Sequence, residues 1–87
     1  VSRGKPDPEP YIAASERLGY APVHCLVVED APAGIEAGRR AGMPVIAVAF
    51  TYSRQQLQLS APDVVIDRIT DMTIQRSGAD GIRITLP

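Results

Sequence analysis

The stretch Cys25-Leu-Val-Val-Glu29-Asp30-Ala-Pro-Ala-Gly34-Ile-Glu-Ala-Gly38-Arg-Arg-Ala-Gly42 decides the fold of this chain. Cys25 to Val28 is apolar without polar alternation, which is typical of a strand buried on both faces in a parallel sheet. Two consecutive carboxylates, Glu29 and Asp30, follow at its carboxyl end. Ligands bind at this edge of an open α/β sheet, and adjacent acids there suit Mg²⁺. Alternatively, Asp30 only caps the next helix, with Pro32 in its first turn.

The segment after Asp30 has the composition of a helix that packs very close to a sheet. Gly34, Gly38 and Gly42 recur every four residues beside a row of alanines, so this surface has almost no side-chain bulk. Glycine costs roughly 1 kcal/mol at an interior helix position, and close backbone approach can offset that cost. We expect the helix to end with Gly42 at C′. Val45 to Val48 then predicts a second buried strand, parallel to the first in a β-α-β unit.

The remaining patterns complete one α/β domain over residues 1–87, a partial doubly wound (Rossmann-like) parallel sheet followed by a hairpin. Asp7 offers the N-cap of a first helix that stops at Gly19. The other expected elements are a polar helix from near Ser53 to Leu59, a third strand at Asp63 to Ile66, and a hairpin of Thr73 to Arg76 with Ile82 to Leu86 around the turn Ser77 to Gly81.

Composition excludes several classes of function. The net charge is −1, and the arginines are scattered without interleaved aromatic residues, so no nucleic-acid groove is expected. No apolar run is long enough to span a membrane, and a single cysteine, Cys25, is expected to be a small buried hydrophobe in a reducing compartment. We therefore expect a cytoplasmic protein. His24, the only histidine, has no partner for a transition-metal site and is interpreted as structural or solvent-facing.

Two motifs together resemble a known family. Gly4-Lys5-Pro-Asp-Pro-Glu-Pro-Tyr11 is followed by a helix ending in Leu18-Gly19 and then by Val-Val-Glu29-Asp30-Ala-Pro-Ala-Gly-Ile-Glu-Ala37. In order and separation these motifs resemble the haloacid dehalogenase-like phosphatases, and most closely their sugar-phosphate phosphatase and β-phosphoglucomutase branch. The resemblance runs from Gly4 to about Asp67.

The resemblance implies a doubly wound hydrolase fold in which an aspartate nucleophile attacks a phosphoryl group. Lys5 matches the family's catalytic lysine, which neutralises charge between the nucleophile and the phosphate. Asp30 matches a carboxylate that ligates Mg²⁺, and Glu29 is either a second ligand or orients a metal-bound water. Phosphoryl transfer depends mostly on positioning and charge stabilisation, so these residue types suit it. The implied substrate is a small phosphorylated metabolite, such as a sugar phosphate.

Other parts of the family's catalytic centre are absent from the sequence. No Asp-x-Asp occurs among the 87 residues, and no Ser or Thr matches the one that ends the family's second strand. We therefore expect this chain to be the C-terminal part of a core domain, without the N-terminal strands and the cap domain, and inactive alone. We also expect the exposed edge of the strand at Cys25 to Val28 to pair with the missing half or with another copy.

Two alternatives remain open at this point. Phosphoacceptor receiver domains share an acidic pair after their first strand, and Ala61 to Asp67 is similar to the strand that carries their phosphorylated aspartate. Receivers also need a later lysine, however, whereas the only lysine here is Lys5, upstream of the acidic pair. Phosphorylation of Asp67 by a small phosphodonor would favour that reading. The other alternative is a non-catalytic partner domain, which would not need to bind Mg²⁺.

Overall fold

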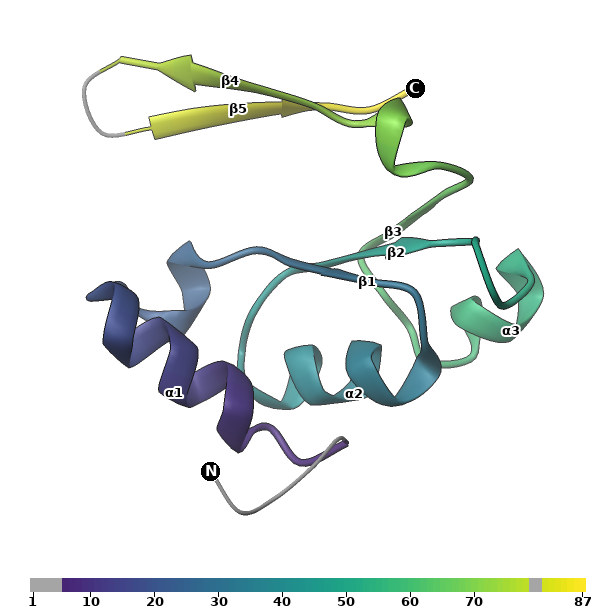
Figure 1. Cartoon of the computed structure of the whole chain (residues 1–87), viewed down its shortest axis with the longest axis horizontal. Coiled ribbons are helices and arrows are strands. Elements are labelled where there is room, and N and C mark those ends of the chain that lie inside the picture. Colours follow the sequence, from purple (N-terminus) through teal and green to yellow (C-terminus); the bar gives the residue numbers. More distant parts are fainter. Residues whose placement is uncertain (1–5, 79–80) are drawn as a thin grey trace.

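A computed structural model of the chain describes residues 6–78 and 81–87 (Figure 1). Lys5 and the centre of the predicted turn, Ala79 and Asp80, lie outside the described residues. The elements in order are α1 (Glu9–Leu18), η1 (Pro22–His24), β1 (Val27–Glu29), α2 (Pro32–Arg40), β2 (Val45–Val48), α3 (Arg54–Gln58), β3 (Val64–Ile66), η2 (Ile69–Asp71), β4 (Thr73–Ser77) and β5 (Gly81–Thr85).

The first three strands form a parallel sheet in the order β1-β2-β3, which confirms the predicted β-α-β unit. β2 has the predicted bounds, and all four of its residues are buried. β1 begins two residues later than predicted, because the chain makes a 3₁₀ turn at η1 and the Cys25 N–H donates to the Pro22 carbonyl at 2.9 Å. The prediction of a strand buried on both faces was wrong for Val28, which is 39% exposed. Cys25 is only half-buried.

The first and third helices match their predicted signals with one correction. α1 begins at Glu9 with Pro8 as its N-cap, so Asp7, the predicted cap, lies one position before the observed one. The Asp7 carboxylate still accepts a hydrogen bond from the Glu9 N–H at 2.9 Å. α1 ends at Gly19 as predicted. α3 begins after Ser53, whose side chain forms a reciprocal capping box with Gln56.

Helix α2 overturns the interpretation of Asp30 as a cap. Its N-cap is Ala31, which leaves the Asp30 carboxylate outside the capping position. The helix ends with Gly42 at C′ in the left-handed conformation, φ +79°, as predicted. The predicted close packing is also present, since a Cβ on Gly38 would lie 2.8 Å from Val45 Cγ2. The row of small residues therefore brings the helix backbone against the sheet.

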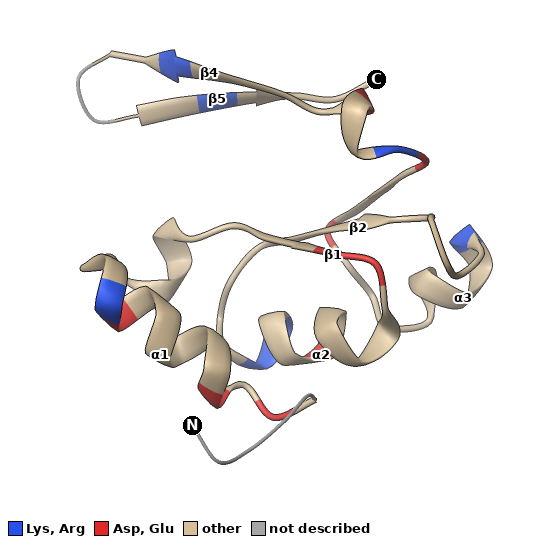
Figure 2. Ribbon diagram, viewed as in Figure 1, with Lys and Arg blue, Asp and Glu red and all other residues tan. Residues whose placement is uncertain are grey.

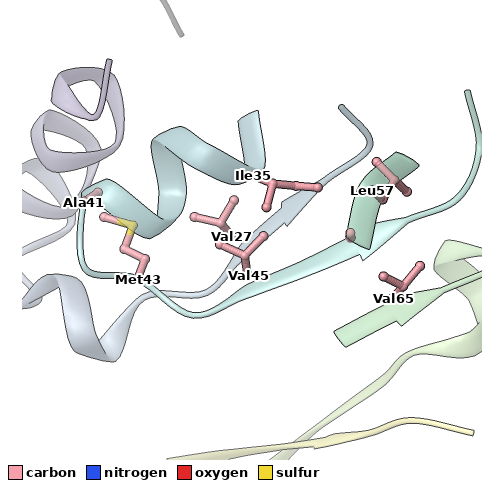
Figure 3. Close-up of a cluster of buried hydrophobic side chains, with 8 residues drawn as sticks. Val27, Ile35, Ala41, Met43, Val45, Leu57 and Val65 are labelled. Carbon is pink, nitrogen blue, oxygen red and sulfur yellow. The ribbon is translucent and has the colours of Figure 1, made fainter. Parts of the chain in front are cut away.

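The two faces of the sheet are covered differently. Helices α1 and α2 lie on one face, where alternate strand residues join a buried cluster (Figure 3) made of Val27, Ile35, Ala41, Met43, Val45, Ala47, Leu57 and Val65. The opposite face presents a smaller cluster of Ile46, Val48 and Ile66, against which Ile84 and Leu86 pack. The uneven covering leaves Val28 exposed on this second face, because it pairs with Ile46 at the edge of the sheet.

The C-terminal segment forms the predicted antiparallel hairpin, with Ile74 opposite Ile84 and Ser77 opposite Gly81. It stands on the side of the sheet away from α2 (Figure 1). β4 is exposed along its whole length, and most of β5 is exposed as well. The segment between β3 and the hairpin, which includes η2, carries the chain past the carboxyl ends of the three parallel strands.

Candidate functional site

The carboxyl ends of all three parallel strands open onto one cavity of about 510 Å³. The cavity is lined at the end of β1 by Glu29 and Asp30, after β2 by Phe50, and after β3 by the residues that lead into η2. Its full lining is Val28, Glu29, Asp30, Val48, Phe50, Asp67, Arg68, Ile69 and Thr70. Because parallel strands end at the same edge, residues distant in sequence meet there, as is usual for ligand sites in α/β sheets.

The two predicted acids are neighbours in the sequence and lie at this edge, Glu29 as the last residue of β1 and Asp30 directly after it. Figure 2 shows the acidic (red) segment where β1 turns toward α2. Asp30 is exposed, and its carboxylate has no capping role in α2. Glu29 is partly buried. The structure therefore places an accessible carboxylate next to one that is held by its surroundings.

Glu29 is held by residues of α1, of α2 and of the turn that joins β1 to α2. The Tyr11 hydroxyl, on α1, donates to Glu29 Oε2 at 2.6 Å, and the Asp30 N–H donates to Glu29 Oε1 at 3.3 Å. The carboxylate also lies directly over Gly34 of α2, where a Cβ would be only 2.0 Å from Glu29 Cδ. Glycine at this position thus leaves the space that the carboxylate occupies.

The cavity also contains residues that the sequence analysis did not assign to the site. Asp67 and Arg68 follow β3, and Phe50, which is 84% exposed, follows β2. Asp67 is bound to α3, because Arg54 Nη1 lies 2.8 Å from Asp67 Oδ1 and Arg54 Nη2 donates to the Val65 carbonyl at 3.1 Å. The rule that predicted Glu29 and Asp30, carboxyl ends of parallel strands, could also have found Asp67 and Arg68.

The remaining candidate residues lie away from the cavity or outside the described chain. His24 is exposed at the end of η1, in agreement with a solvent-facing interpretation. Lys5 lies outside the described residues, so its place relative to Asp30 stays a prediction. Tyr11, in the first turns of α1, contacts Glu29, and the start of α1 is thereby fixed beside the acidic pair.

The donor atoms at this edge fit a hard cation in part. Carboxylate oxygens are the ligands that Mg²⁺ prefers, and it is usually bound by one or two carboxylates with water and substrate phosphate. Asp30 and Glu29 are the residues that would hold it. Within residues 6–78 and 81–87, no group of three or more His, Cys, Asp or Glu is arranged to hold a metal ion. The described residues therefore supply two carboxylates of such a site and leave room for other ligands.

Comparison with known proteins assigns the sequence to a protein family. Residues 1–42, which include both motifs, match the model of the haloacid dehalogenase-like hydrolases. The chain belongs to the haloacid dehalogenase-like family. This confirms the resemblance predicted from Lys5, Glu29 and Asp30, and it removes the receiver domain as an alternative.

This haloacid dehalogenase-like chain is similar to relatives and solved structures that are named as phosphatases or as a phosphomutase. It is 41% identical to the bifunctional riboflavin kinase/FMN phosphatase of Arabidopsis thaliana, over 100% of this chain and 24% of that protein. It is also 41% identical to hexitol phosphatase A of Escherichia coli K12, over 87% of this chain and 34% of that enzyme. A putative β-phosphoglucomutase from Bacteroides vulgatus matches the fold with a TM-score of 0.73 and 37% identity, over 77% of this chain and 28% of that structure.

The chain thus spans about a quarter to a third of the length of these relatives. The structural match supports the predicted Rossmann-like architecture. In the part of the chain that the structure describes, no helix is long and apolar enough to cross a bilayer.

Proposed function

We propose that this chain carries the lysine and the acidic pair of a Mg²⁺-dependent phosphatase or phosphomutase that acts on a small phosphorylated metabolite. The main support for this proposal is the position of Glu29 and Asp30. They lie at the carboxyl end of β1 and line a cavity that the ends of three strands share. Family membership and the phosphatase names of its relatives support it. A sugar phosphate is the proposed substrate class, in line with the hexitol phosphatase and β-phosphoglucomutase relatives.

Each residue has a separate task in this proposal. Asp30 is the primary carboxylate for the cation, because it is exposed at the cavity and is not used by α2. Glu29 either ligates the same cation or orients its water. When bound, the cation would contribute charge stabilisation at the transferring phosphoryl group.

Lys5 is proposed to balance charge between the nucleophile and the phosphate. It precedes Tyr11 by six positions, and Tyr11 contacts Glu29, so the two motifs are joined at the start of α1. A cation about 4 Å from an anion contributes roughly 4 kcal/mol at an effective dielectric near 20. That magnitude is enough to change a rate by several hundredfold if it acts only in the transition state.

The nucleophile would come from outside these 87 residues. The complete enzyme is proposed to form an aspartyl-phosphate intermediate, and the Asp-x-Asp that would supply its aspartate is absent from this sequence. We propose no side chain of these 87 residues as the nucleophile in its place. We therefore propose that the chain by itself does not hydrolyse phosphate esters and that it acts with the N-terminal half of the same fold, in the cytoplasm.

A chimera with a complete relative tests the function. The part of hexitol phosphatase A that aligns with this chain is replaced by this chain, and phosphate release is measured with Mg²⁺ over a panel of sugar phosphates. The chimera should be active, and Asp30→Asn and Lys5→Met should each lower turnover at least a hundredfold with little change in unfolding temperature.

Glu36→Gln is the matched control, because Glu36 is an acid on α2 whose carboxylate is bound to Arg40 at 2.9 Å, away from the cavity lining. It should leave turnover within about twofold. An active chimera in which Asp30→Asn and Lys5→Met are as active as Glu36→Gln would refute the proposed roles. It would favour the non-catalytic alternative.

A further inference from the structure

The contact between Tyr11 and Glu29 joins two motifs whose chemistry is otherwise assigned separately. Tyr11 belongs to the segment after Lys5, and Glu29 lies 18 residues farther along, yet the hydroxyl and Oε2 are 2.6 Å apart. A charged acceptor gives a short and strong hydrogen bond. The contact is also part-buried, so water competes with it less than at the surface.

Two further features restrict the same carboxylate. The Asp30 N–H donates to Oε1, and α2 presents a bare Cα at Gly34, where any Cβ would overlap Glu29 Cδ and Oε2 at 2.0 and 2.2 Å. The space at Gly34 therefore accommodates the carboxylate, and the Tyr11 hydroxyl selects its orientation. Tyr11 and Asp30 thus each donate to a different oxygen of the Glu29 carboxylate.

We infer that Tyr11 is a positioning residue for the cation site: its hydroxyl holds Glu29 so that this carboxylate supports cation binding at Asp30. The inference rests on the proposed function and names a further residue for the same site. Tyr11 does not touch the cation or the substrate in this role. It acts through Glu29, and removal of such an outer hydrogen bond typically lowers metal affinity by 10- to 100-fold.

A Mg²⁺ titration of the 87-residue chain, followed by backbone amide NMR shifts, measures this effect without an activity assay. Tyr11→Phe removes only the hydroxyl. We expect the dissociation constant at the Asp30 amide to rise by about tenfold, the lower end of the range for outer-shell partners. Tyr20→Phe is the matched control, because Tyr20 is 64% exposed and lies outside the cavity lining. It should leave the constant unchanged.

A second background separates positioning from a general loss of structure. With Glu29→Gln the charge that Tyr11 orients is gone, so adding Tyr11→Phe should change the dissociation constant by less than about twofold. A merely structural tyrosine would weaken binding equally in both backgrounds, and that result would overturn the inference. If the Tyr11→Phe variant does not fold, the Glu29→Gln variant tests the inference instead. A Mg²⁺ affinity that Glu29→Gln leaves unchanged would then overturn the role of Tyr11.

The same titration distinguishes failure of the inference from failure of the proposed function. Asp30→Asn should abolish the shifts centred on the acidic pair. If it does not, both the cation site and the role of Tyr11 are refuted. If it does, while Tyr11→Phe binds Mg²⁺ as well as Tyr20→Phe, only the positioning role is refuted and the proposed function stands.

Discussion

Replacing Gly34 by alanine tests the packing of the acidic pair through stability alone. At a helical position this change normally favours folding by roughly 1 kcal/mol, because alanine has the higher helix propensity. Here the new Cβ would lie 2.0 Å from Glu29 Cδ and 2.3 Å from Glu29 Cγ, so the glutamate side chain must leave its place. The hydrogen bond from Tyr11 would then be lost.

The magnitude follows from these opposing effects. A hydrogen bond to a charged group contributes about 1.5–3 kcal/mol, and the lower part of that range applies because Glu29 is only partly buried. The lost hydrogen bond outweighs the gain in helix propensity. We therefore expect Gly34→Ala to lower the free energy of unfolding by about 1 kcal/mol. In a Glu29→Ala background the obstruction is removed, and the same substitution should stabilise the chain by up to about 1 kcal/mol.

Urea unfolding followed by far-UV circular dichroism measures both steps of this cycle. The predicted coupling of roughly 2 kcal/mol exceeds the few tenths of a kcal/mol by which independent sites deviate from additivity. If Gly34→Ala stabilises the chain equally in both backgrounds, the predicted coupling between Gly34 and Glu29 is absent. That result would mean that Glu29 does not occupy the space above Gly34 in solution.

The other predictions concern the metal, the exposed edge and the cavity wall. The chain alone should bind Mg²⁺ only weakly, since two carboxylates without substrate phosphate make a poor site; submicromolar binding by calorimetry would contradict this. We propose that the chain associates through the outer edge of β1, because unpaired strand edges invite pairing, so Val28→Lys should shift sedimentation toward the monomer, and unchanged association would exclude this edge. Arg54→Met should destabilise the chain by less than about 1 kcal/mol in urea unfolding, because Arg54 and Asp67 are 51% and 65% exposed, and a larger loss would mean that this contact anchors α3.

Much of the fold could be predicted because burial and sequence pattern coincide. β2 was predicted with its observed bounds, since all four of its residues face buried surroundings. Alternation revealed the hairpin. The start of β1 was missed because Cys25 and Leu26 are apolar but continue a turn held by backbone hydrogen bonds. Hydropathy does not distinguish an apolar turn from a strand.

The candidate site was predictable only where local sequence carried the signal. Two acids directly after an apolar strand indicated the edge of a parallel sheet, and the structure places both at the cavity. Asp67 and Arg68 line the same cavity directly after the predicted third strand. The same strand-end rule could have found them, but they were not assigned to the site. The contact from Tyr11 to Glu29 spans 18 residues, and it depends on how α1 packs beside α2, which helical periodicity does not specify.

In the proposed enzyme, this chain holds the lysine and the acidic pair of a divided phosphatase centre. To test this division, the chain is mixed with a separately produced N-terminal segment of hexitol phosphatase A, and phosphate release from sugar phosphates is measured. We predict no Mg²⁺-dependent release from either part alone and clear release from the mixture, which Asp30→Asn in this chain abolishes. If a monodisperse monomer of this chain hydrolyses phosphate esters by itself, the catalytic centre is not divided and this proposal is wrong.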